Sequence, residues 1–63
     1  MSEEKAQYGA PTKAELIAQM ERLKAEMHKT AEMLIGYGVG HHALEVTGAA
    51  VMLQTWIDGV RDE

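Results

Sequence analysis

Apolar or small side chains recur at alternating intervals of four and three residues between Thr12 and Ile35, a segment without Gly or Pro. The recurring positions are Leu16, Met20, Leu23, Met27, Thr30 and Leu34. This spacing is a heptad seam, and it predicts an amphipathic helix over residues 12–35. Thr12 and Glu15 have the spacing of a capping box, which indicates where the helix begins.

A second heptad pattern predicts a helix over residues 41–61. Its members are Ala43, Val46, Ala50, Leu53, Ile57 and Val60. Ala49, Met52 and Trp56 form another stripe beside this row, so the helix is apolar on more than one face. Because one partner helix covers only one face, the pattern predicts a further contact. We expect an oligomer interface at Ala49, Met52, Leu53 and Trp56.

The glycine-rich segment 36–40 separates the two patterns and predicts a loop, with Gly36 ending the first helix in the left-handed conformation. A loop of this length joins antiparallel neighbours. The fold class expected is all-α, an antiparallel helical hairpin (12–63) with a short polar N-terminal arm (1–11). A chain of 63 residues buries little surface alone, so we expect the hairpin to assemble into a homo-oligomeric helical bundle, a dimer or larger.

Composition excludes several classes. The chain contains no Cys, which rules out disulfides and thiolate metal sites and favours a reducing compartment. Its net charge of −4 argues against binding to duplex nucleic acid. The acidic start lacks an apolar signal region, and Ala49–Leu53 is the longest apolar run without Gly. We therefore expect a cytoplasmic protein without a membrane partner.

Catalytic groups are scarce. Ser2 is the only serine, and no spacing places two carboxylates in an apolar pocket. His41 and Glu45 have the spacing of metal ligands, but two ligands leave a site incomplete, and an exposed pair is the simpler interpretation. We predict no enzyme activity, no catalytic residues, no metal and no cofactor.

One group of residues suits an anionic ligand. The glycine-rich segment leads into a helix N-terminus, where free N–H groups and the helix dipole attract anions. Two histidines follow, Lys13 adds a positive charge, and Tyr8 could stack on a ring. A simple turn and an aromatic residue that fastens the arm remain alternatives. The candidate ligand contacts are Tyr8, Lys13, Gly38, Gly40, His41 and His42.

The layout of an arm with Tyr8, a capped helix from Thr12 and an antiparallel second helix ending near Val60 resembles a known family. It is similar to the small helical-hairpin sponge proteins with which phages sequester cyclic-nucleotide immune signals. The resemblance implies a homo-oligomer that binds cyclic oligonucleotides at subunit interfaces without cleaving them. Those proteins are longer, and they carry an Arg/Trp-containing segment where this chain has Gly40-His41-His42-Ala43-Leu44.

Two functions follow as hypotheses. The first is a non-enzymatic homo-oligomer that sequesters an anionic small ligand, expected to be a nucleotide signal, cyclic or linear, as in phage counter-defence. The alternative is a protein–protein interaction module, an adaptor or small inhibitor that docks a partner through the apolar face of the second helix.

Overall fold

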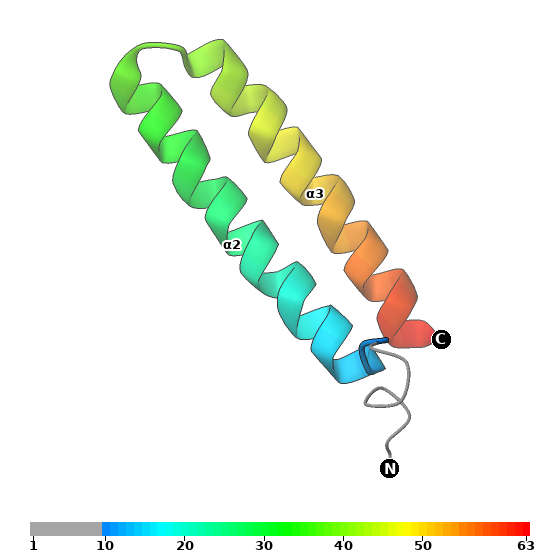
Figure 1. Ribbon diagram of the computed structural model, residues 1–63. Coiled ribbons are helices and arrows are strands. Elements are labelled where there is room, and N and C mark those ends of the chain that lie inside the picture. The colour runs from blue at the N-terminus through cyan, green and yellow to red at the C-terminus, as the bar shows by residue number, and fades with distance from the viewer. Residues whose placement is uncertain (1–9) are drawn as a thin grey trace.

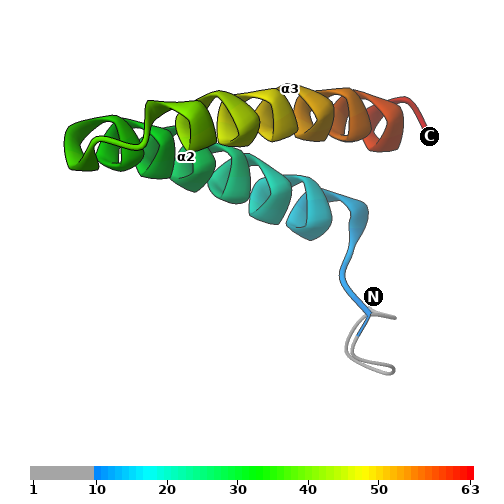
Figure 2. The same cartoon turned by 90° about the horizontal axis from the view of Figure 1, so that it is seen from above.

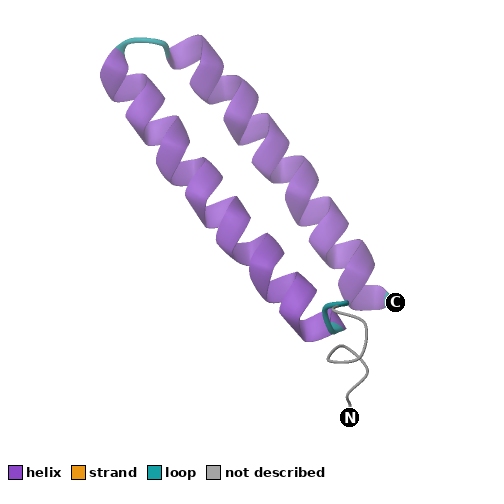
Figure 3. Cartoon of the chain, viewed as in Figure 1, coloured by secondary structure: helices purple, strands orange, loops and turns teal. Residues whose placement is uncertain are grey.

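The computed structural model describes residues 10–63, which form two helices. Helix α2 spans Lys13–Tyr37 and helix α3 spans Gly40–Asp62. The helices lie side by side and antiparallel, so that the chain ends of the hairpin meet at one end of the rod and the connection lies at the other (Figures 1 and 3). The predicted all-α helical hairpin is confirmed. Residues 1–9 of the predicted arm, Tyr8 among them, lie outside the described part of the chain.

A capping box starts α2 as the sequence predicts. The Glu15 backbone N–H donates to the Thr12 hydroxyl oxygen at 3.1 Å, and the Thr12 N–H donates to the Glu15 carboxylate at 3.1 Å. Two backbone donors that the first helical turn cannot satisfy internally are thereby satisfied. The boundary at Thr12 is therefore fixed by local chemistry.

The connection is shorter than predicted, because α2 continues through Gly36 and Gly38 takes the left-handed conformation instead, with φ at 99°. The Gly38 N–H donates to the carbonyl of Ile35 at 3.1 Å, and the Val39 N–H donates to that of Leu34 at 3.0 Å. These two bonds make a Schellman motif, which needs its left-handed residue one position after the last helical turn. The prediction that Gly36 ends the helix is wrong, and only residues 38 and 39 separate the helices.

The predicted row of α3 forms its side of the hairpin core. Ala43, Ala50, Leu53 and Ile57 are buried, and Val46 and Val60 are half-buried. Leu53 is only 4% exposed. This residue, expected at the oligomer interface, therefore packs inside the hairpin itself.

The heptad row predicted for α2 is not the row that contacts α3. The two rows differ by a rotation about the axis of α2. Leu16, Leu23 and Thr30 are exposed, whereas the residues that follow each of them are buried or half-buried: Ile17, Lys24 and Ala31. One residue corresponds to a turn of about 100° around the helix. As a prediction of the contact inside the hairpin, the seam through Leu16, Leu23 and Thr30 is wrong.

Small side chains explain the rotation. Ala31 lies in the row that faces α3, where Ala43 and Ala50 are also buried, and small residues allow two helix backbones to approach closely. Lys24 belongs to the same row because its side chain is half-buried, with its ammonium donating to the Gln54 amide oxygen. Towards the chain ends larger residues fill the interface, and Figure 2 shows the helices diverging in that direction.

Candidate functional site: an apolar face and a loop end

The hairpin has two broad faces with different chemistry. Leu16, Leu23 and Thr30 precede the contacting residues of α2 by one position, and Ala49 and Trp56 precede those of α3 by one position. Because both helices are right-handed and they run antiparallel, residues turned in the same sense from the contact emerge on the same face of the pair. We call this the apolar face.

Large side chains on the apolar face stay accessible to solvent. Leu16 is 38% exposed, Leu23 48%, Met52 50% and Trp56 56%. Met20 and Met27 are half-buried between these residues and the contact with α3. The stripe Ala49, Met52 and Trp56, predicted to lie outside the hairpin contact, is exposed.

Polar contacts between the helices distinguish the opposite face. Arg61 donates to the Glu21 carboxylate at 3.0 Å, and Lys24 donates to Gln54. Within α3, Gln54 in turn donates to Asp58 at 2.9 Å. Exposed Leu44 and Val51 also belong to this side of α3. Over most of its length α2 contributes small or polar residues to this side, with Ile35 as a large exposed residue at the loop end. Away from the loop end, the large exposed residues of both helices therefore share the apolar face.

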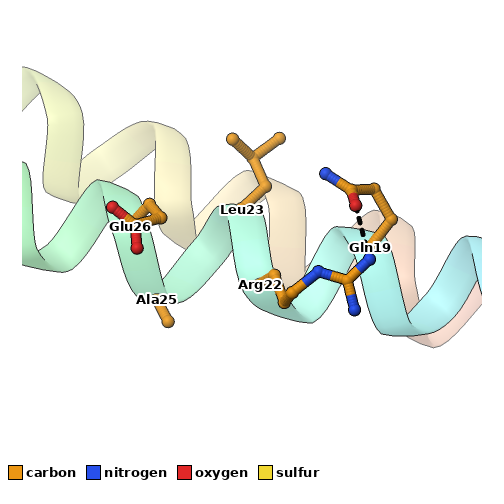
Figure 4. A pocket seen from close by; sticks show the side chains of 5 residues that line it. All are labelled: Gln19, Arg22, Leu23, Ala25 and Glu26. Carbon is orange, nitrogen blue, oxygen red and sulfur yellow. Dashed lines mark hydrogen bonds between the residues drawn. The ribbon is translucent and has the colours of Figure 1, made fainter.

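An open depression borders the apolar face on the outer side of α2, with a volume of about 350 Å³. Its lining is Gln19, Arg22, Leu23, Ala25 and Glu26 (Figure 4). The Arg22 guanidinium donates to the Gln19 amide oxygen at 2.6 Å, while Leu23 projects from the helix in the direction opposite to Ala25. All the lining comes from one helix, so this depression does not enclose a small ligand as a binding pocket does.

The loop end collects four of the six candidate ligand contacts. Gly38 lies in the connection, Gly40 begins α3, and His41 and His42 occupy the first turn of that helix. The two imidazole rings lie with centroids 4.0 Å apart at 47°, and His42 Nδ1 lies 3.1 Å from a Glu45 carboxylate oxygen. Glu45 thus pairs with His42 rather than with His41, whose spacing had suggested metal ligands. Across residues 10–63, no three His, Asp or Glu side chains gather as a metal site.

Backbone donors at this end have no side-chain cap. Val39 holds the N-cap position of α3 without a side-chain hydrogen bond, and the first turn contains no acidic residue. A Cβ atom built on Gly38 or Gly40 would meet nothing within 4 Å, so the surroundings of the loop are open. The His42 N–H donates to the Val39 carbonyl at 3.0 Å, which leaves the N–H groups of Gly40 and His41 open to water or to an anion.

Lys13 lies at the opposite end of the rod from the other described candidates. It is the first residue of α2, whose 25 residues extend about 37 Å at the helical rise. One chain therefore cannot bring Lys13 to the histidines. Tyr8 belongs to the residues outside the description.

Comparisons with protein-family models, with curated proteins and with solved structures find no match for this chain. Within residues 10–63, neither helix combines the length and hydropathy that crossing a membrane requires. The structure shows a helical hairpin with one apolar face. At the loop, α3 begins without a side-chain cap. The resemblance to phage sponge proteins stays a prediction.

Proposed function

We propose that the protein is a non-enzymatic binding protein that works as a homo-oligomer, held together through the apolar face as a helical bundle. The observation that carries this proposal is the rotation of α2. Its heptad row of Leu16, Leu23 and Thr30 is exposed beside α3 instead of packing against it. A heptad row is a pattern for helix–helix contact, so this row needs a helix that the hairpin does not contain.

A second layer of helices supplies that contact. In a four-helix bundle each helix has two neighbours, and its apolar row points between them towards the common centre. Met20 and Met27 of α2 already lie half-buried beside α3, while Leu16 and Leu23 are exposed beside them. The seam of α2 is therefore half-buried at some positions and exposed at others. This is expected of a bundle helix that has one of its two neighbours in place.

Sedimentation velocity at micromolar concentration tests this proposal. We expect the wild-type chain to sediment as a dimer or larger, and the L23E variant as a monomer, because the variant puts a charge at the centre of the apolar face. V51E is the matched control, since it places the same charge at a 61% exposed apolar position on the opposite face. A wild-type chain that is folded and monomeric contradicts the proposal and favours the alternative, in which the face docks a helix of a different protein.

A second proposed function is capture of an anionic small ligand at the loop end, most plausibly a cyclic nucleotide signal. It is supported by the uncapped start of α3, the open surroundings of Gly38 and Gly40, and the imidazole pair of His41 and His42. Helix N-termini attract phosphate, and protonated imidazoles add donors. The link to phage counter-defence follows from the resemblance alone.

Calorimetry against a panel of cyclic and linear nucleotides tests this second function. We expect binding by the wild-type chain and its loss in H41A and H42A, with unchanged helix content by circular dichroism. The T47A variant is a control, because Thr47 lies further along α3 at an exposed position. If no member of the panel binds with a dissociation constant below about 100 μM, the proposed capture of a nucleotide is wrong. The proposed oligomer is tested separately, by sedimentation.

A further inference from the structure

We propose that two copies of the chain dock head to tail through the apolar face, so that the loop of each copy lies beside the start of α2 of the other. This inference rests on the proposed self-association and adds its symmetry and register. The occupant of the apolar face is thus a second copy of this chain, turned end for end. The resulting dimer is a four-helix bundle with a two-fold axis across the middle of the rods.

The size of the face fits such a partner. The described chain measures 48 × 20 × 12 Å between its Cα extremes. A face about 20 Å wide over helices about 36 Å long offers a projected area of about 700 Å². Stable protein interfaces bury about 800 Å² on each partner. One further hairpin therefore covers the face along its whole length.

Two symmetric arrangements bring one apolar face onto another. A two-fold axis along the rods places both loops at one end and stacks α2 of each copy on α3 of the other. A two-fold axis across the rods places the loops at opposite ends, and stacks α2 on α2 and α3 on α3. Each arrangement keeps neighbouring helices antiparallel, so the choice depends on the side chains at the outer edges of the face.

The outer edges of the two helices differ in polarity. The outer edge of α2 is polar and charged over its middle, with Gln19, Arg22 and Glu26, and becomes apolar at Met33 towards the loop. The outer edge of α3 is uncharged over its middle, where the exposed Met52 lies between Gly48 and Gly59. Stacking α3 on α3 covers Met52 with another apolar edge, whereas the same-end arrangement places it against charged side chains. Burying charge beside Met52 carries a desolvation cost that the head-to-tail arrangement avoids.

The alignment of the two copies along the rod follows from residue pairs that lie symmetrically about the middle of α3. Ala49 and Trp56 lie at equal distances on either side of Met52 and Leu53. A two-fold axis at that level therefore sets Trp56 of each copy against Ala49 of the other, a large side chain against a small one.

The same axis passes the middle of α2, where Arg22 and Glu26 lie at equal distances on either side of Lys24. It brings Arg22 of each copy towards Glu26 of the other, so that opposite charges meet twice at the rim.

Head-to-tail docking also brings together candidate ligand contacts that lie at opposite ends of a single chain. Lys13 of each copy reaches the end at which the other copy presents Gly38, Gly40, His41 and His42. The described candidate ligand contacts are then divided between two chains at each end of the bundle. The same-end arrangement leaves Lys13 a full helix length from every loop.

A spin-label distance tests the orientation, because the chain has no Cys and one introduced thiol is therefore unique. Tyr37 is 86% exposed at the loop end, one heptad beyond Thr30, so a Y37C label lies outside the hairpin core, and sedimentation of the labelled protein checks that it still associates. By pulsed electron paramagnetic resonance we expect a label-to-label distance of about 35–45 Å, close to the helix length. V51C is the control, since this mid-rod position on the opposite face gives similar distances in both arrangements.

The outcomes separate this inference from the proposal beneath it. A loop-to-loop distance below about 20 Å, the width of two packed helices, together with dimeric sedimentation, overturns the head-to-tail orientation and leaves self-association standing. Absence of dipolar coupling for both labels in a folded, monomeric protein overturns both. A long distance for Y37C, with the control distance present, supports the head-to-tail bundle.

Discussion

Truncation of Trp56 to Ala tests the apolar face most directly. Trp56 is 56% exposed in the single hairpin. A tryptophan presents up to about 250 Å², so the accessible part of each Trp56 is about 140 Å². At about 25 cal/mol per Å², full burial of that surface contributes about 3.5 kcal/mol. Removing half of this from each copy, to allow for partial exposure at the rim, leaves about 2 kcal/mol for each copy and about 4 kcal/mol for a dimer.

A loss of about 4 kcal/mol raises the dissociation constant of the dimer about a thousandfold, since each 1.4 kcal/mol is a factor of ten. Sedimentation equilibrium over a range of concentrations measures this constant for the wild-type chain and W56A. The matched control is V51A, which shortens a 61% exposed side chain on the opposite face and leaves the constant unchanged. The wild-type indole supplies a second readout, because its emission shifts to longer wavelength when dilution separates the copies.

The reasoning is refuted if W56A and the wild-type chain dissociate with the same constant. It is equally refuted if Trp56 emits as a fully hydrated indole in protein that sediments as an oligomer. In either case the stripe through Ala49, Met52 and Trp56 is not the contact between copies. The hairpin itself should keep its helix content in W56A, because Trp56 is not part of its core.

Three further substitutions test the local chemistry of the helices by urea unfolding at a fixed protein concentration. G38A should destabilise the fold by about 1–2 kcal/mol, because a Cβ atom is disfavoured at a φ of 99°; equal stability would show that the turn can reorganise. T12A should cost about 1 kcal/mol by removing the hydroxyl that caps α2, and T12S serves as the control that keeps this acceptor. G48A should add about 1 kcal/mol, because Gly48 is helical and a Cβ atom there meets nothing within 4 Å; destabilisation would reveal a close neighbour supplied by another chain.

How far the sequence predicts this fold depends on the number of neighbours that each helix has. The row of α3 could be read correctly because Ala43, Ala50 and Ile57 face α2 in the single hairpin. In α2 the heptad contains positions for two neighbours, and nothing in the spacing says which neighbour belongs to the same chain. Lys24 hides this distinction further, since a charged residue at an inner position is accommodated only through its hydrogen bond to Gln54.

The loop end shows the same limit at shorter range. Gly38, Gly40, His41 and His42 are close in sequence, so their proximity could be predicted. Which glycine ends the helix, Gly36 or Gly38, could not be predicted, because either one tolerates a positive φ. The helix ends at Gly38 because the carbonyls of Leu34 and Ile35 accept the hydrogen bonds that close its last turn. The partner of Glu45 also depends on rotamers, which direct its carboxylate to His42 rather than His41.

The divergence of the two helices away from their connection has a consequence for how the chain reaches its native state (Figure 2). The buried residues nearest the turn, Ala31 and Ala43, belong to segments separated by a short stretch of sequence, so bringing these segments together costs the least chain entropy. We therefore expect the contacts between the two helices to form first beside the turn and then progressively towards the chain ends. Amide protons of α2 near Leu34 should exchange most slowly, and those near the chain ends should exchange first.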